Sequence, residues 1–289
     1  MAISAQQVKE LRDKTGAGMM DCKKALTEAN GDFEKAIEIL RKKGASVAAK
    51  RAERAANEGI VLTKVSEDGT KAYIVEVNCE TDFVAKSDDF VGLSNFILDT
   101  IIAYEPQNVE ELVTLEHQGK KVQDELTNAI GKIGEKIEVS RFAIENVPGG
   151  MLVDYIHHGS KLGVLIKAEN VAESQKEEYS TLLKDIAMQA AAMKPSFVNR
   201  EAVPAGTIEK EIEIYKEIAK KEGKPEQVLE RIATGKLNKF YEENCLLEQS
   251  FIKDNSKSVG ALIEESNKKH SAQSKVTKFY RYHLGDENK

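Results

Sequence analysis

The sequence predicts an α+β fold, with a small helical unit ahead of a body built from strands and helices. Apolar residues recur at helical spacing in the first 55 residues, and from Glu58 onward they alternate along short strands. A hairpin followed by a helix then occurs twice, over Gly59–Tyr104 and over Met151–Met193. Strands and helices in this order are typical of α+β proteins rather than of a doubly wound parallel sheet.

Residues 1–55 predict three short amphipathic helices. Ser4 can cap the first helix and Asp32 the third, while the two glycines of Thr15–Gly18 separate the first from the second. The apolar positions at helical spacing are Val8, Leu11, Cys22, Ala25, Leu26, Ala29, Phe33, Ala36, Ile37 and Leu40. Such helices bury one small shared core, and the following stretch Ala45–Asn57 is predicted to be a linker helix.

Residues 56–147 are predicted to form the first of two core subdomains. Gly59–Val65 and Lys71–Cys79 read as strands, and Asp68-Gly69 between them is typical of a hairpin turn. Helices are expected at about 87–104, 109–115 and 120–133. The strand Ile137–Ile144 completes this subdomain.

The second core subdomain is predicted over residues 148–204 and 246–289. Its strands Met151–His157 and Leu162–Lys167 turn at His158-Gly159-Ser160. A helix follows over about 172–193, and Pro195 ends it. Near the end of the chain Ser258 can cap another helix, and Val276–Leu284 alternates as a last strand.

Residues 205–245 predict an antiparallel coiled-coil hairpin inserted into this second subdomain. Apolar residues there are spaced by four and three, the spacing of a coiled-coil seam, on both sides of a turn at Gly223-Lys224-Pro225. The seam positions are Ile208, Ile212, Tyr215 and Ala219, and on the return Leu229, Ile232 or Ala233, Leu237 and Phe240. The remaining positions are densely charged, so we expect the hairpin to project from the body.

Composition and charge describe a soluble protein of a reducing compartment. The 289 residues are 41% hydrophobic and 31% charged, and the net charge of −6 argues against a protein that coats nucleic acid. Residues 1–55 carry +4, which makes a modestly basic head. The apolar runs are too short for a membrane span, and the first residues lack the pattern of a secretory signal. Three distant cysteines fit neither a disulfide framework nor a metal site, so a cytoplasmic location is expected.

The sequence shows no recognisable active site, and it predicts no resident metal or cofactor. Gly16-Ala17-Gly18 lies between two helices rather than after a strand, so it is a poor phosphate loop. His157 and His158 are adjacent and point to opposite faces of a strand. Cys79 as a thiol nucleophile would need a base, and none can be named.

The most informative segment is Asn78–Lys86, where a strand runs into an acidic and an aromatic residue before the next helix. Asp82 and Phe83 are therefore expected on a surface connection, capped on its far side by Ser87. An aromatic residue at such a place is either a lid on its own core or an anchor for a partner.

Longer stretches of the chain resemble one family. Val8–Asp32 closely resembles the head of bacterial elongation factor Ts, and Asn78–Lys86 resembles that family's second signature. Further matches occur in the family's order at Ile133-Gly134-Glu135, His158-Gly159, Ala191–Pro195 and Gly223-Lys224-Pro225. Together these matches cover about nine-tenths of the chain.

The resemblance implies a non-catalytic guanine nucleotide exchange factor for elongation factor Tu, a GTPase of translation. It also implies a ubiquitin-associated-like head, a two-part core and a coiled-coil insertion. By similarity, Thr81, Asp82, Phe83 and Val84 would dislodge the Mg²⁺ of the bound nucleotide. The GTPase domain would also meet Arg12, Met19, Met20, Ile133, Gly134 and His158, and the coiled coil would reach the far end of the GTPase. Membranes and nucleic acid are not expected as partners.

Two departures and two alternatives accompany this resemblance. Family members often continue into a further helical module, whereas only Gly285–Lys289 follow Leu284, so contacts of that module are not expected. His157 precedes the His-Gly pair as an extra residue, and the family's histidine is assigned to His158. A ubiquitin-associated-type adaptor would explain the head alone, and a thiol or hydrolytic enzyme would have to use Cys79.

Overall fold

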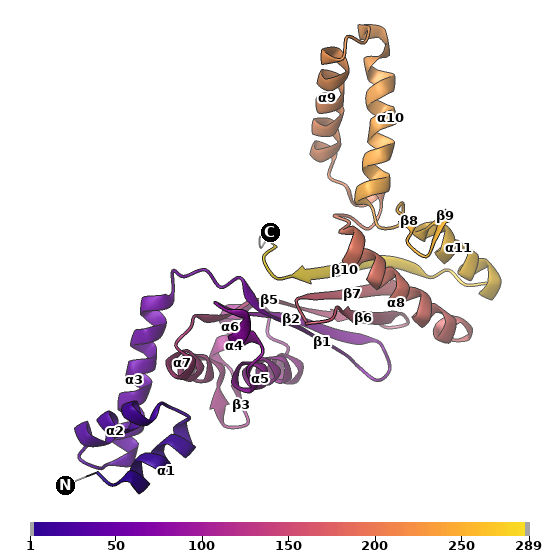
Figure 1. Cartoon of the computed structure of the whole chain (residues 1–289). Coiled ribbons are helices and arrows are strands. Elements are labelled where there is room, and N and C mark those ends of the chain that lie inside the picture. The colour runs from indigo at the N-terminus through magenta and orange to yellow at the C-terminus, as the bar shows by residue number, and fades with distance from the viewer. Residues whose placement is uncertain (1–2, 287–289) are drawn as a thin grey trace.

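The computed structural model describes residues 3–286, so Met1, Ala2 and Glu287–Lys289, which the predicted domains include, lie outside the described residues. Figure 1 shows an elongated molecule with a helical head at one end, a body of sheets and helices, and a pair of helices that projects from the body. The mixture of helices and strands agrees with the predicted α+β class.

The head consists of α1 (Ala5–Thr15), α2 (Met19–Glu28) and α3 (Phe33–Arg51). Ser4 and Gln7 form a reciprocal capping box at the start of α1, and the Asp32 side chain caps α3. The small core of the head contains Val8, Leu11, Cys22, Ala25, Leu26, Ala29 and Ala36. The predicted linker helix over Ala45–Asn57 is wrong as a separate element, because α3 continues unbroken to Arg51 and residues 52–57 are not helical.

The continuation of α3 packs against α7 (Val122–Ile133) of the body, and two glycines lie at the crossing. A Cβ atom added to Gly131 would lie 2.9 Å from the Gly44 Cα atom, and one added to Gly44 would lie 3.0 Å from the Thr127 carbonyl oxygen. The absence of side chains at both glycines therefore allows the two backbones to approach closely.

Gly131→Ala should lower the free energy of unfolding by about 1–2 kcal/mol, because the clash at the crossing outweighs the gain in helix propensity. Urea unfolding followed by circular dichroism measures the change. Gly235→Ala is the control: apart from its chain neighbours and the backbone of its own helix, no heavy atom of the described residues lies within 4 Å of a Cβ added there, so that variant should be as stable as the parent or more so. Equal stability of Gly131→Ala and Gly235→Ala would contradict the crossing.

Two three-stranded antiparallel sheets form the body. The first has the order β1-β2-β5, and its strands are Glu58–Val65, Lys71–Cys79 and Ile137–Asn146. The second has the order β10-β7-β6, with strands Lys275–His283, Leu162–Glu169 and Met151–Ile156. Both predicted hairpins are confirmed, and Gly69 has a φ of +72° in the turn of the first hairpin.

Both faces of the central strands are covered: β2 is buried from Ala72 to Cys79, including the polar residues Glu76 and Asn78. One face of each sheet contributes to a shared cluster that includes Val61, Ile74, Leu152, Leu165 and Tyr282. The other faces pack on helices: α5 (Asp88–Tyr104), α6 (Val109–Thr114) and α7 on the first sheet, and α8 (Lys176–Met193) and α11 (Val259–His270) on the second.

The projecting pair consists of α9 (Ala205–Lys221) and α10 (Glu226–Asn244), which run antiparallel side by side (Figure 1). The predicted inner positions face the partner helix: Ala219, Leu229 and Ala233 are buried, and Ile208 and Ile212 are half-buried. Its base packs on the body through Val203, Leu237, Tyr241 and Cys245.

Several short elements were not predicted from the sequence. The expected helix at 172 begins as a 3₁₀ turn, and the one at 120 begins as a short strand. The additional elements are α4 (Asp82–Ala85), β3 (Glu116–His117), β4 (Lys120–Lys121), β8 (Ser250–Phe251), β9 (Asp254–Ser258), η1 (Glu173–Gln175) and η2 (Arg200–Ala202). These pieces have two to five residues each, too few for a periodic sequence signal.

Candidate functional site

The connection between β2 and α5, residues Thr81–Lys86, is called the Phe83 turn below. It contains the four-residue helix α4, which the Thr81 side chain caps by accepting from the Val84 N–H at 3.4 Å. Phe83 is 82% exposed, while Ala85 is buried and Val84 packs half-buried on the core. The aromatic side chain is therefore not a lid on the protein's own core, and the expected surface position of Phe83 is confirmed.

A carboxylate from a distant part of the chain holds the start of the Phe83 turn. Glu135 accepts from the Thr81 backbone N–H at 3.0 Å and from the Thr81 hydroxyl at 2.7 Å. Glu135 follows Gly134, whose φ of +81° ends α7 and turns the chain into β5. Ile133, half-buried against the core, lies just before that turn. The fold thus brings the predicted residues Ile133 and Gly134 beside Thr81.

Glu80 joins the same region to the end of the head. Its carboxylate accepts from Arg51 at 2.7 Å, from Arg54 at 3.0 Å and from the backbone N–H of Lys136 at 2.7 Å. Burial alone would raise the pKa of Glu80, but these hydrogen bonds outweigh it and lower the pKa to about 2. Glu80 therefore stays ionised and links the end of α3 and the residues after it to the strand ends beside the Phe83 turn.

Asp82 is an ionised surface carboxylate next to Phe83. Lys86 donates to it at 2.8 Å, which lowers the pKa of Asp82, and the charge of Lys161 lowers it further. Lys161 belongs to the turn between β6 and β7, and it donates to Glu58 at 2.6 Å. The β6–β7 turn therefore lies on the same side of the body as Asp82.

The β6–β7 turn also carries His158, whose side chain is exposed. The Ser160 carbonyl oxygen accepts from the Val61 N–H at 2.7 Å, which fixes the turn against β1 of the other sheet. The neighbouring His157 is engaged instead, because its Nδ1 atom lies 2.8 Å from the Tyr155 hydroxyl. Both histidines are exposed, and they differ in that the ring of His157 contacts Tyr155.

Arg12, Met19 and Met20 lie on the head, apart from the Phe83 turn. Met19 is 45% and Met20 64% exposed at the start of α2, and Arg12 is exposed on α1. The loop between these helices lies beside α7, since a Cβ added to Gly16 would come within 2.9 Å of the Lys132 ammonium. The loop that precedes Met19 and Met20 therefore lies beside the Lys132 side chain of α7.

The structure argues against enzyme chemistry at Cys79. Its side chain is completely buried, and burial together with the nearby Glu135 carboxylate raises the pKa of the thiol to about 12. A thiol in this state is not a nucleophile at neutral pH. Across residues 3–286, three or more histidine, cysteine or acidic side chains do not gather into a possible metal site.

A cavity of about 560 Å³ lies between the head and α5 and α7, away from the Phe83 turn. Charged side chains on its wall pair with one another: Lys43 with Asp21, and Lys132 with Asp89 at 2.7 Å. The helices that the structure describes also lack the length and apolar character needed to cross a bilayer.

Sequence reasoning missed three charged residues around the Phe83 turn: Glu135, which holds Thr81, Glu80, which holds the segment that carries Glu135, and Lys161, whose charge acts on Asp82. Glu80 and Glu135 stand inside or next to the quoted motifs, so their acidic character was visible. Their partners lie 56 and 54 residues away along the chain. Only the pairing of β2 with β5 brings these residues together.

Comparisons with known proteins agree on one family. The sequence profile described as Elongation factor TS matches residues 80–286, which include the Phe83 turn, Ile133-Gly134 and His158. The chain is 47% identical to Elongation factor Ts of Prosthecochloris aestuarii over 287 residues, which cover 98% of this chain and 99% of that protein. It is 48% identical to the protein of that name from Chlorobium limicola, with the same coverage, and 46% identical to that of Clostridium kluyveri, covering 98% and 93%.

Proposed function

This chain belongs to the elongation factor Ts family and is thus a translation elongation factor, and we propose that it is the guanine nucleotide exchange factor of elongation factor Tu. It would bind the GDP complex of that GTPase, displace Mg²⁺ and promote release of GDP, so that GTP can bind. It would act in the cytoplasm and perform no covalent chemistry itself.

The observation that carries this proposal is Phe83, an aromatic side chain held 82% exposed on a short helix beside an ionised aspartate. GTPases hold GDP through a phosphate-binding loop and a Mg²⁺ ion that bridges the phosphates to protein groups. We propose that Phe83 inserts beside this ion, together with Thr81, Asp82 and Val84. Burial of the aromatic ring, worth about 1.5–3 kcal/mol, would offset the distortion that disrupts the metal shell.

The remaining predicted residues would bind the GTPase around the inserted Phe83. Ile133, Gly134 and His158 are proposed to line the same contact from the body. Arg12, Met19 and Met20 are proposed to pack on a helix of the GTPase domain, which the exposure of both methionines supports. Apolar residues left exposed on a protein surface are common at binding sites.

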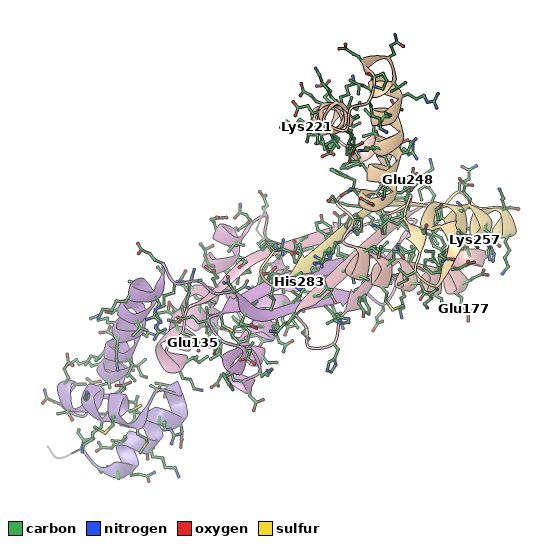
Figure 2. All side chains as sticks on the ribbon, turned by 45° about the horizontal axis from the view of Figure 1, so that its top comes forward. Glu135, Glu177, Lys221, Glu248, Lys257 and His283 are labelled. Carbon is green, nitrogen blue, oxygen red and sulfur yellow. The ribbon has the colours of Figure 1, made fainter. Side chains whose placement is uncertain are left out.

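The α9–α10 pair is proposed to be a coiled coil that reaches the far end of the GTPase. Ile214 and Ile218 are 48% and 38% exposed on α9, one helical turn apart, and Val228 on α10 is 37% exposed. Lys221, near the tip of the pair, lies far from Glu135 beside the Phe83 turn (Figure 2). One molecule would therefore bind its partner at two separated sites, the Phe83 turn and the α9–α10 pair.

We propose the same division of the chain as the sequence predicts. The ubiquitin-associated-like head would comprise residues 1–55 and the first core subdomain residues 56–147. The second core subdomain would comprise 148–204 and 246–289, and the coiled coil 205–245. The separate apolar clusters of the head and of the two helix-covered sheet faces support this division.

A nucleotide release assay tests the proposed function. Elongation factor Tu is loaded with a fluorescent GDP, and the release rate is measured while this protein is added. We expect the rate to rise with factor concentration and then to saturate. By reciprocity, excess GDP should dissociate the complex of factor and GTPase. Release at the spontaneous rate over the whole titration would overturn the proposal.

A further inference from the structure

Two carboxylates extend the pairing of β2 and β5 beyond its last residues. The strands pair up to Cys79 and Ile137, and the Phe83 turn begins two residues later. Past that pair, Glu80 accepts from the Lys136 backbone N–H and Glu135 accepts from the Thr81 backbone N–H. Side-chain carboxylates thus take the place of the backbone acceptors of a sheet. A side chain after β2 binds the backbone before β5, and a side chain before β5 binds the backbone after β2.

The Phe83 turn needs such support because it has little of its own. An isolated helix of four residues is unstable in water, and of the residues Asp82–Ala85 it is Ala85 that is buried. The Thr81 hydroxyl donates to Glu135 at 2.7 Å, whereas its own bond to the Val84 N–H is long, at 3.4 Å. At the far end, the Ser87 hydroxyl donates to the Val84 carbonyl oxygen at 2.8 Å. Polar bonds at the two ends, together with the packing of Val84 and Ala85 on the core, therefore set where Phe83 points.

We propose that Glu135 is a positioning residue for nucleotide exchange: it holds the Phe83 turn in the conformation that presents Phe83 to the GTPase. Glu80 supports Glu135 by fixing the segment that carries it. The bonds of Glu80 to Arg51 and Arg54 connect these two carboxylates to the head. This inference rests on the proposed exchange function. A turn that is ordered before docking loses less conformational freedom when the aromatic ring inserts.

Such a role predicts a particular kinetic pattern for Glu135→Ala. Docking through the head and the coiled coil stays intact, so the factor concentration that gives half-maximal release should change by less than about twofold. The maximal release rate should fall by about tenfold, the effect expected from losing hydrogen bonds to a charged acceptor. Fluorescent GDP release at increasing factor concentrations separates the two quantities.

Three further variants test whether the effect passes through Thr81. Glu138→Ala is the matched control, because Glu138 lies on β5 and pairs with Lys136 at 2.9 Å instead of Thr81. Thr81→Val loses the hydroxyl that donates to Glu135, so its maximal release rate should be lower than that of the parent. The double variant Thr81→Val with Glu135→Ala should be no slower than Glu135→Ala alone. Additive losses would overturn the proposal.

Hydrogen exchange in the free protein tests, without the GTPase, whether Glu135 orders the Phe83 turn. In Glu135→Ala, the amides of residues 82–85 should exchange faster, while those of residues 90–101 in α5 keep their protection. Unchanged exchange at 82–85 would overturn the proposal, and so would loss of protection throughout α5, because Glu135 would then support the whole fold. If the parent protein fails to accelerate GDP release, the exchange function is wrong, and the amide measurement still decides whether Glu135 orders the turn.

Discussion

Phe83→Ala should slow the release of GDP from elongation factor Tu by about 10- to 100-fold at a fixed, subsaturating factor concentration. The estimate follows from the 1.5–3 kcal/mol that burial of a large apolar side chain contributes. In the free protein the ring is 82% exposed, so this energy becomes available only in the complex. The measurement is the release of fluorescent GDP under conditions in which the parent protein gives half of its maximal rate.

Stability measurements separate this effect from damage to the fold. Since the Phe83 side chain lies mostly in solvent, its truncation should change the free energy of unfolding by no more than about 0.5 kcal/mol. Ile252→Ala provides a matched control, because Ile252 is 47% exposed on the turn between β8 and β9. Its release rate should equal that of the parent. A release rate for Phe83→Ala equal to that of Ile252→Ala would remove Phe83 from the mechanism.

The sequence was sufficient to predict most long elements because their signals are local. Ser87 and Ser258 both cap helices where expected, and Asp68-Gly69 forms the turn of a hairpin. The spacing of apolar residues that predicts α9 also predicts which of its residues face α10. In each case the residues that determine the element are neighbours in the chain, so their pattern is readable without knowledge of the fold.

Whether Phe83 is a lid or an anchor could not be decided from local pattern. The answer depends on what covers the turn between β2 and α5, which tertiary structure decides. The role of Glu135 was hidden for the same reason, since its contact with Thr81 spans 54 residues. The stretch Ala45–Asn57 was wrongly predicted as a separate linker helix, because its composition does not show that α3 runs through Gly44 and packs against α7.

The two sheets of the body are joined partly by charge, and Glu145 is the centre of that contact. It lies on β5 in the first sheet with 9% of its side chain exposed. It accepts from Lys167 at 2.8 Å, and from Lys278 and Tyr280 at 2.7 Å each, all from the second sheet. A buried carboxylate with three donors is well satisfied, but its removal leaves two ammonium groups without their counter-charge.

Glu145→Ala should therefore lower the free energy of unfolding by about 3–5 kcal/mol, the usual cost of breaking a buried ion pair on one side. Urea unfolding at neutral pH measures the loss. For comparison, Glu265→Ala breaks a surface pair with Lys257 in which the glutamate side chain is 62% exposed, and it should cost less than about 1 kcal/mol. Similar losses for both variants would show that Glu145 contributes no more than a surface charge.

Acid should reveal the same interaction through the pKa of Glu145. Burial alone would raise that pKa, but the hydrogen bonds from Lys167, Lys278 and Tyr280 outweigh it and lower it to about 2. A carboxyl group whose pKa is lower in the folded than in the unfolded state stabilises the fold above the unfolded value, near 4.3. That stabilisation disappears as the pH falls toward 2.

Between pH 5 and pH 2 the parent should therefore lose more stability than Glu145→Gln, which has no carboxyl group to protonate at this position. Some loss should persist in the variant, because the pKa of Glu80 is also lowered to about 2. Urea unfolding at a series of pH values measures both profiles. Parallel profiles would mean that the charge of Glu145 does not join the sheets, and the contact would then depend on the apolar cluster around Ile74 and Leu165 alone.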